Sequence, residues 1–421
     1  MTVHVVKSGE SIWSIAQSYQ VPLSSIIEAN QLNQNETIIP GLALYIPNNG
    51  LPIRSQIVSL GDTISNLAKK FQTSINLILM ANPGINPYQL RIGQKVNIPS
   101  PLKLVMETLG FIVPYSPKSF LPVLNQIASN LTYLSIVSYS LTYEGYAYIL
   151  LDDTDLITES RRLNVVPLLM IRNFVNDEFS PDLIGRVLEN PRYRQNLINS
   201  LMSFILQKGY GGVSIDFEFI PPPRRLDFNL FLSELKGALG SLILHVNVHA
   251  KTEDIPTNRI IGAYDYEAIG RAADIVAVMT IDYGYPTGPP NPVSPLWWME
   301  QVIRYATSLI NPQKLQIALP LYGYDWRLSD NKTSAHSLLG AQNLSIATGS
   351  VINYNPQAAT PSFTYWHGAE EHMVWFDDIR SFQEKYKLID QYGLLGTTYW
   401  QLSLAFPQNW FFMDQNFLIT Q

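Results

Sequence analysis

The segment Tyr210-Gly-Gly-Val-Ser-Ile-Asp-Phe-Glu218 alternates polar and apolar side chains, which predicts a β-strand. Because side chains two residues apart share a face of a strand, Ser214, Asp216 and Glu218 face one way. The apolar set that faces the other way is Val213, Ile215 and Phe217. We expect the apolar set to pack on helices and the polar set to face the interior of a β/α barrel, with Glu218 at its carboxyl-terminal rim.

Asp216 and Glu218 place two carboxyl groups on one strand face, about 6–7 Å apart, where their negative charges repel each other. One member of such a pair tends to keep its proton near neutral pH, which makes a glutamic acid a usable general acid. An isolated Asp-x-Glu pattern more often reflects an ion pair with a basic neighbour at the strand end. The choice between these interpretations therefore depends on the rest of the chain.

Strand-like apolar runs alternate with helical stretches from about residue 103 onward. The runs are Leu109–Pro114, Leu134–Val137, Val165–Met170, Gly212–Asp216, Leu242–Val248, Ile275–Met279, Leu315–Leu319 and Gly396–Trp400. Eight βα units in about 320 residues predict an α/β fold, a TIM (β/α)8 barrel. The long interval between the seventh and eighth runs predicts a small inserted subdomain over about 325–375, followed by a helix over 376–392.

The first hundred residues contain an internal repeat with an offset of 52 residues and no gap. The matching positions are Val6 and Val58, Gly9 and Gly61, Ala16 and Ala68, Tyr19 and Phe71, Asn30 and Asn82, Gly41 and Gly93, Ile46 and Ile98, and Pro47 and Pro99. Each copy begins with a short strand, after which Ser11 or Thr63 provides a helix N-cap. A second helix, a glycine turn and a closing strand complete a βααβ unit.

The two repeats resemble the LysM module over residues 2–99, and this resemblance implies binding to chains of N-acetylglucosamine. A purely structural role for two small modules is the alternative. The segment Asn48–Pro52 links the copies, and Pro99–Pro101 separates them from the rest of the chain. We therefore expect LysM modules at 1–48 and 53–100, ahead of a barrel domain at 101–421.

The barrel domain resembles glycoside hydrolase family 18. The segment 210–218 is similar to its Asp-x-x-Asp-x-Asp-x-Glu signature, and Val278–Asp282 is similar to its Met-x-Tyr-Asp motif on strand six. Ala318–Gly323 matches the family's seventh strand, and Tyr399-Trp400 matches the Trp that closes the floor of the sugar pocket. Segments that resemble the spore peptidoglycan N-acetylglucosaminidases, a subgroup with two N-terminal LysM modules, are Leu321–Trp326, Val374–Arg380 and Pro407–Trp410.

The resemblance, which covers nearly the whole chain, implies a substrate-assisted reaction that retains the configuration of the anomeric carbon. It implies that Glu218 protonates the leaving oxygen and then acts as a base for water. It also implies that Asp216 orients the acetamido group of the substrate, whose carbonyl attacks the anomeric carbon. The residues expected to bind the sugar are Ser214, Asp282, Tyr283, Tyr322 and Trp400.

Three positions depart from the family pattern. Gly211 and Ser214 stand where the signature has its first two aspartates, and Ile281 stands where the strand-six motif has its tyrosine. Tyr283 is expected on the same face as Ile281 and is the candidate for the missing hydroxyl. These departures leave open a barrel that binds sugar without cleaving it.

The composition and the remaining motifs disfavour several other classes of protein. A formal net charge of -6 and a pI near 5.6 disfavour nucleic acid as a partner. The chain has no cysteine for disulfides or thiolate metal sites, and no apolar run long enough to cross a membrane. His245 and His249 share a strand face, but Asn247 stands between them and no carboxylate is expected in register, so we predict no metal and no other cofactor.

We interpret the chain as a glycoside hydrolase that cleaves β-1,4 bonds after N-acetylglucosamine in spore cortex peptidoglycan, anchored by its LysM modules. The alternatives are a chitinase on the same fold and a non-catalytic, peptidoglycan-binding protein of the spore coat. The segment Met1–Lys7 lacks a signal-peptide pattern, which fits synthesis in the mother cell and deposition at the spore coat or cortex, with the cytoplasm as the other expected location. We expect a monomer, and we expect removal of residues 1–100 to weaken attack on intact wall while sparing soluble fragments.

Overall fold

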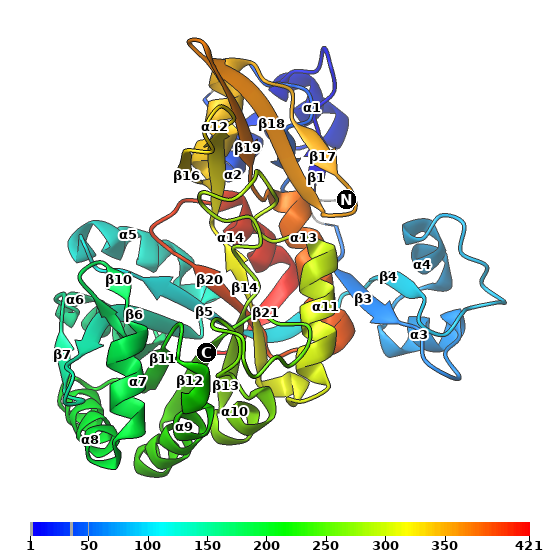
Figure 1. The fold of residues 1–421 in the computed structure, drawn as a ribbon. Coiled ribbons are helices and arrows are strands. Elements are labelled where there is room, and N and C mark those ends of the chain that lie inside the picture. The colour runs from blue at the N-terminus through cyan, green and yellow to red at the C-terminus, as the bar shows by residue number, and fades with distance from the viewer. Residues whose placement is uncertain (1–2, 34–36, 49) are drawn as a thin grey trace.

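The computed structural model describes residues 3–33, 37–48 and 50–421, so Asn49 of the expected linker lies outside the described residues. The centre of the molecule is a closed parallel barrel, in which β5 pairs with β6 on one side and with β20 on the other (Figure 1). The barrel strands are β5 (Leu104–Ile112), β6 (Tyr133–Leu141), β8 (Val166–Arg172), β11 (Gly212–Asp216), β12 (Ile243–His249), β13 (Ile275–Met279), β14 (Leu315–Pro320) and β20 (Gly396–Trp400). Every strand expected from the sequence is present, and the prediction of a TIM barrel is confirmed.

Helices surround the barrel and connect its strands (Figure 1). They are α5 (Pro117–Ile127), α6 (Thr154–Arg162), α7 (Pro181–Glu189), α8 (Pro191–Lys208), α9 (Arg225–Leu239), α10 (Tyr266–Ala272), α11 (Leu296–Thr307), α13 (Ile379–Tyr392) and α14 (Pro407–Asn416). The short strands at the margins are β7 (Ala147–Ile149), β9 (Phe174–Val175), β10 (Glu178–Phe179) and β21 (Phe417–Ile419). Local sequence sets the helix ends: Asn190 caps α8 and Pro191 occupies its first position, while Gly209 ends it at a φ of 75°.

Strand β11 has the two-sided environment that its alternating sequence predicts. The side chains of Val213 and Ile215 are fully buried in the core between the barrel and its helices. Phe217 continues this apolar face beyond the strand, and its ring lies 5.8 Å from that of Phe231 on α9. This packing fixes which face of the strand is outside, so the polar face points into the barrel.

A five-stranded antiparallel sheet is inserted between β14 and β20, as the long interval in the sequence predicts. Its elements are β15 (Tyr322–Arg327), β16 (Thr333–Ser337), α12 (Leu338–Thr348), β17 (Asn353–Asn355), β18 (Thr360–His367) and β19 (Glu370–Trp375). The insertion begins slightly earlier than expected, because β15 follows β14 almost directly. The next helix, α13, starts later than the expected residue 376, because Asp378 and Ser381 form a capping box.

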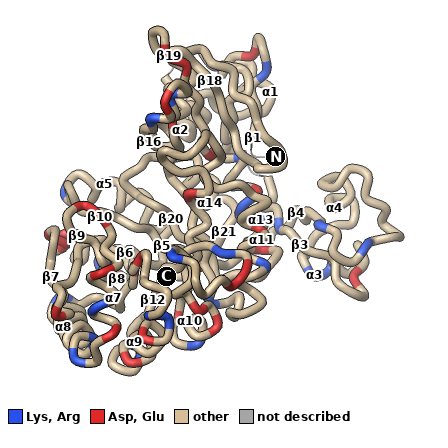
Figure 2. Tube along the Cα trace, viewed as in Figure 1, with Lys and Arg blue, Asp and Glu red and all other residues tan. Residues whose placement is uncertain are grey.

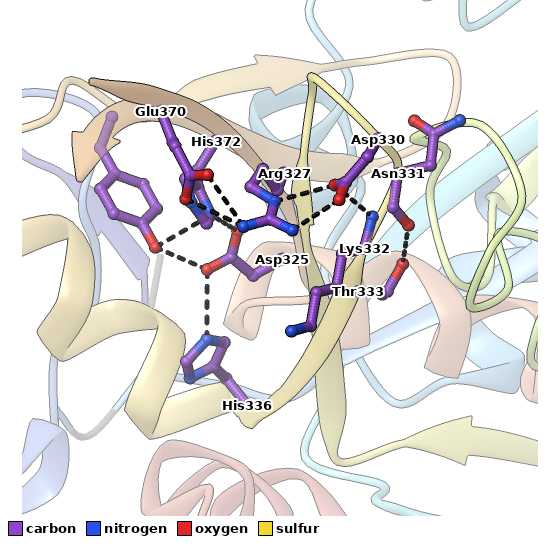
Figure 3. Close-up of polar contacts among 10 residues, drawn as sticks. Asp325, Arg327, Asp330, Asn331, Lys332, Thr333, His336, Glu370 and His372 are labelled. Atoms are coloured by element: carbon purple, nitrogen blue, oxygen red, sulfur yellow. Dashed lines mark hydrogen bonds and ion pairs between the residues drawn. The ribbon is translucent and has the colours of Figure 1, made fainter. Parts of the chain in front are cut away.

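Asp325 joins β15 to its neighbours in the insertion through a polar network (Figure 3). Its buried carboxylate accepts hydrogen bonds from the hydroxyl of Tyr365 at 2.6 Å and from Nδ1 of His372 at 2.8 Å. Nε2 of His336 lies 3.5 Å away on the other side. Burial would raise the pKa of Asp325, but the hydrogen bonds from His336, Tyr365 and His372 outweigh it and hold the pKa below its ordinary value. The network therefore holds an ionised carboxylate that ties β15 to β16, β18 and β19.

The N-terminal repeats fold as the βααβ units that their sequence predicts. The first consists of β1 (Val3–Val5), α1 (Ile12–Tyr19), α2 (Leu23–Asn30) and β2 (Ala43–Tyr45). The second consists of β3 (Ile53–Ile57), α3 (Ile64–Lys70), α4 (Ile75–Ala81) and β4 (Lys95–Pro99). Ser11 and Thr63 cap the first helix of each copy by accepting a hydrogen bond from the backbone N–H three residues later.

The two repeats attach to the rest of the molecule in different ways. The apolar core of the first repeat is continuous with that of the barrel domain and includes Leu44 and Tyr45 of β2. The second repeat has a separate core and projects from the side of the molecule (Figure 1). A bidentate ion pair between Arg54 and Asp390 of α13 holds it there. The first repeat is thus part of the main body, which argues against the expectation that removal of residues 1–100 spares the cleavage of soluble fragments.

Charged residues of both signs lie interspersed along the outer helices of the barrel (Figure 2). An example is the i,i+4 pair of Arg271 and Glu267 on α10. Among the residues that the structure describes, no helix combines the length and the apolar character needed to cross a membrane.

Candidate active site

The carboxyl end of β11 carries the two carboxyl groups expected from the sequence. Asp216 ends the strand with only 4% of its surface exposed, whereas the side chain of Glu218 is 17% exposed at the barrel rim. The Asn173 side chain accepts a hydrogen bond from the backbone N–H of Glu218 and donates one to its carbonyl oxygen, both at 2.9 Å. Because one amide satisfies both backbone groups, Glu218 is held firmly after the strand has ended.

Strands β11 and β12 carry three polar pairs along their shared interior face. The parallel register opposes Ser214 to His245, and Oγ of Ser214 lies 2.9 Å from Nδ1 of His245. One step along the strands, Asn247 is the hydrogen-bonding neighbour of Asp216. One step further, Oε2 of Glu218 lies 3.3 Å from Nε2 of His249. The side-chain period of two thus brings the polar face of each strand against that of the other.

The expectation that no carboxylate would lie in register with His245 and His249 was wrong. The neighbouring strand β11, and not β12 itself, supplies Asp216 and Glu218 at the matching positions. Within residues 3–33, 37–48 and 50–421, no group of three or more histidine or acidic side chains is arranged to hold a metal ion. The two histidines belong to the polar face of the site, and the alternating pattern 245–249 beside that of 214–218 is the sequence signal that points to them.

Burial raises the pKa of Asp216 to about 8, and the charge of Glu218 adds to the rise. The guanidinium of Arg172 and the Asn247 amide oppose this effect. Arg172 stands opposite Asp216 in the register of β8 and β11, and its guanidinium lies 4.5 Å from the centre of the Phe174 ring. Burial also lowers the pKa of His245 to about 3, so this imidazole is neutral. Asp216 therefore holds a proton near neutral pH and can donate a hydrogen bond.

Asp282 forms a second acidic position, on the segment that follows β13. Its Oδ1 accepts hydrogen bonds from the hydroxyls of Tyr322 at 2.6 Å and Tyr324 at 3.0 Å. Burial raises the pKa of Asp282, the two tyrosines oppose the rise, and the charges of Glu218 and His249 also act on it. Asp282 is therefore electrostatically part of the same site as the carboxyl groups of β11.

Tyr324 is a site residue that the sequence analysis missed. Tyr322 and Tyr324 are two apart on β15 and so share a face, which is the signal that identifies the second tyrosine. Trp400, at the end of β20, packs against the cluster that contains both tyrosines, and its ring lies 5.5 Å from that of Phe111 inside the barrel. Tyr322, Asp282 and Trp400 are thus brought together as expected.

Ser214 and Tyr283 lie in other surroundings. Ser214 is fully buried with its hydroxyl beside Nδ1 of His245, so it has no surface open to a bound sugar. The backbone of Asp282 has a φ of 57°, so the chain after β13 is no longer a strand and the shared-face argument for Tyr283 does not apply. The ring of Tyr283 instead packs against Trp297 and Trp298, at 5.3 and 5.4 Å.

Comparison with known proteins assigns both the barrel and the N-terminal repeats to known families. Residues 177–405 match the family described as glycosyl hydrolases family 18, and residues 4–47 and 57–99 each match the LysM domain. The chain is 32% identical to the putative sporulation-specific glycosylase YdhD of Bacillus subtilis, over 97% of both chains. It is 30% identical to the cortical fragment-lytic enzyme of Bacillus anthracis, over 99% of this chain and 98% of that one.

The whole architecture, and not only the barrel, has a counterpart among solved structures. The crystal structure of the Bacillus cereus spore cortex-lytic enzyme SleL superposes with a TM-score of 0.87 at 29% identity, covering 99% of this chain and 98% of that chain. The predictions of a glycoside hydrolase and of two LysM modules are confirmed. The chain belongs to glycosyl hydrolases family 18 and carries two LysM domains ahead of its catalytic barrel.

Proposed function

We propose that this glycosidase cleaves β-1,4 bonds after N-acetylglucosamine in spore cortex peptidoglycan, with Glu218 as its general acid. The observation that carries the proposal is the position of Glu218 at the barrel rim, two residues beyond a buried, proton-holding Asp216. Glycosidases need a proton donor next to the scissile oxygen, and TIM-barrel enzymes carry such groups at the carboxyl ends of their strands.

In the proposed reaction, Glu218 gives its proton to the leaving oxygen as the glycosidic bond breaks. The carbonyl oxygen of the substrate's own acetamido group bonds to the anomeric carbon and forms an oxazolinium ion. The unprotonated oxygen of the Asp216 carboxyl group accepts the hydrogen bond of the acetamido N–H and so orients the acetamido carbonyl for attack. Water then opens the oxazolinium ion while Glu218 recovers a proton from it, so the product keeps the β configuration.

The sugar at the cleavage point is proposed to rest on Trp400 and to be held by the polar groups around Asp282. Asp282 has two tyrosine donors on one oxygen, Oδ1, which leaves Oδ2 as an acceptor for a sugar hydroxyl. Trp400 contributes a flat apolar surface of the kind that stacks on sugar rings. Tyr322 and Tyr324 keep the Asp282 carboxylate in place.

Cortex peptidoglycan as the substrate is supported by the relatives. The protein of Bacillus anthracis is named a cortical fragment-lytic enzyme, and that of Bacillus cereus a spore cortex-lytic enzyme. The LysM domains support anchoring to a polymer of N-acetylglucosamine, which raises the local concentration of the barrel on an insoluble wall. We propose synthesis in the mother cell, action at the spore as a monomer, and no requirement for a metal or organic cofactor.

The test is to incubate the purified protein with spore cortex, vegetative wall and chitin, and to identify the products by mass spectrometry. Cortex fragments with N-acetylglucosamine at the reducing end are expected. Release of chitin oligomers with intact cortex would assign a chitinase instead. Binding to cortex without products from any polymer would assign a non-catalytic wall protein.

A further inference from the structure

His249, which the family signature does not include, stands beside the proposed acid. Its Nε2 lies 3.3 Å from Oε2 of Glu218, and the two side chains are 18% and 17% exposed. In the described part of the chain, this Nε2 is fully shielded from solvent and makes no hydrogen bond of good geometry, so its contact with Glu218 is a close approach at ion-pair distance. The nitrogen therefore faces the Glu218 carboxyl group with no competing partner among the described residues.

The imidazole of His249 is held in this position from several sides. The hydroxyl of Tyr266 donates a hydrogen bond of 2.7 Å to the carbonyl oxygen of His249. The His249 ring packs against those of Phe219 at 5.4 Å and Tyr264 at 5.5 Å. A ring fixed in this way cannot swing away from Glu218 without disrupting the aromatic packing.

The other ionisable groups that face this pair come from four elements. They are Asp216 on β11, Arg172 on β8, Asp282 after β13 and Tyr264 before α10. Asp216 holds its proton near neutral pH, because burial raises its pKa to about 8, and the Tyr264 hydroxyl is neutral, because burial raises its pKa. Two of the four ionisable neighbours of the pair are therefore neutral near neutral pH.

We propose that His249 and Glu218 share one proton, and that His249 thereby keeps the acid supplied at pH values where a lone carboxyl group would be ionised. This inference rests on the proposed role of Glu218. The shared proton lies either on Oε2 beside a neutral imidazole or on Nε2 beside a carboxylate. After Glu218 has protonated the leaving oxygen, the proton taken from water restores the pair to its starting state. His249 acts through Glu218 and is a positioning residue.

A shared proton should change the alkaline limb of the pH profile of kcat, which is the high-pH side on which activity falls. The last proton of a coupled pair is lost at a higher pH than that of either group alone, because the carboxylate favours the imidazolium. The variant His249→Gln keeps a polar group near Glu218 but cannot take a proton. We expect its alkaline limb in kcat to move to lower pH by about one unit or more, as removal of a neighbouring opposite charge does, with little change in KM.

His245→Gln is the matched control, because His245 lies on the same strand and face but is neutral throughout. Burial lowers the pKa of His245 to about 3, so its replacement is expected to leave the alkaline limb in place, whatever it does to stability. An alkaline limb in His249→Gln that coincides with that of the wild type, with kcat lowered evenly at all pH values, would overturn the proposal in favour of a purely structural role for His249.

A second measurement uses Glu218→Gln and does not depend on the folding of the His249 variant. The chain has six histidines, so the imidazole of His249 can be followed by nitrogen NMR as the pH is changed. Its titration midpoint is expected to fall in Glu218→Gln, and an unchanged midpoint would also contradict the shared proton. If Glu218→Gln remains active on cortex, the proposed function fails. If that variant is inactive while the His249 readouts do not move, only the role of His249 fails.

Discussion

The side-chain amide of Gln408 donates a hydrogen bond of 2.7 Å to Oδ1 of Asn30, which joins helix α14 of the barrel domain to the first LysM module. Both side chains are almost fully buried. The same Asn30 oxygen accepts the backbone N–H of Tyr45 at 2.8 Å, and its amide donates to the carbonyl of Tyr45. One asparagine therefore closes the module internally and connects it to the catalytic body.

Asn30→Ala is expected to lower the thermal stability of the barrel. The substitution removes the Asn30 partners of the Tyr45 backbone N–H and carbonyl, and a buried polar group left unsatisfied costs about 1–3 kcal/mol. The Gln408 amide loses its shortest hydrogen bond and keeps those to Ala43 and Gln342. The equivalent Asn82 makes the same internal bonds in the second module, so Asn82→Ala is a matched control. Calorimetry should show a lower barrel transition for Asn30→Ala only. Equal barrel transitions in both variants would contradict the structural integration of the first module.

Glu218→Gln should lower the rate of cortex cleavage by at least about 10²-fold, the low end of what general acid catalysis contributes. Glutamine keeps the shape of the side chain and can still pair with the Asn173 clamp, which contacts only the backbone of residue 218. Binding of the variant to cortex in a pull-down assay should be unchanged. Residual activity above about one percent would place the proton donor elsewhere.

The substrate's acetamido group should be essential to cleavage. A soluble cortex oligosaccharide with free glucosamine at the cleaved position has no carbonyl oxygen to attack the anomeric carbon, so it should resist hydrolysis. A thiazoline analogue of the oxazolinium ion should inhibit, and proton NMR should detect the β anomer as the first product. Cleavage of the deacetylated substrate at a normal rate would refute substrate assistance.

The raised pKa of Asp216 predicts how the free energy of unfolding changes with pH. Its pKa is raised to about 8 by burial and by Glu218, so between the ordinary value of 3.8 and this pH the folded state carries a proton that the unfolded state lacks. The free energy of unfolding must therefore fall as pH rises through this window, by at most about 1.4 kcal/mol per pH unit. Asp216→Asn should flatten the dependence measured by urea unfolding at pH 5 to 7. A variant with the wild-type slope would show that Asp216 is not protonated in the fold.

Tyr324→Phe should lower kcat/KM by about tenfold, because it removes one of two hydrogen bonds to the buried Asp282, and bonds to charged groups contribute about 1.5–3 kcal/mol. Tyr365→Phe removes a hydroxyl of the same kind from Asp325, which follows Tyr324 on β15 and so faces the other side of the inserted sheet. We expect that control to lower the stability of the insertion and to leave kcat/KM within about threefold. A similar loss of kcat/KM in both variants would mean that Tyr324 affects activity by stabilising the inserted sheet and not by its hydrogen bond to Asp282.

The sequence of β11 by itself determined which side of the barrel wall each of its side chains faces. In a strand of alternating polar and apolar residues, only one orientation buries all the apolar side chains against the helices. Val213 and Ile215 had to pack on the helices, and this placed Asp216 on the inner face and Glu218 at the rim. The same local logic identified the repeats, because an N-cap such as Ser11 or Thr63 acts on the helix that follows it directly.

Pairings between distant segments were decided only by the tertiary structure. His249 meets Glu218 because β12 lies beside β11 in one particular register, and the local pattern of β12 alone suggested that no carboxylate would be near. The two LysM copies share a local pattern. Nevertheless, Asn30 accepts a hydrogen bond from Gln408 of the barrel domain, whereas its counterpart Asn82 accepts one from Asn97 of its own module. Periodicity is a property of consecutive residues, whereas register and docking depend on which surfaces exclude water together, and that is settled only when the whole chain packs.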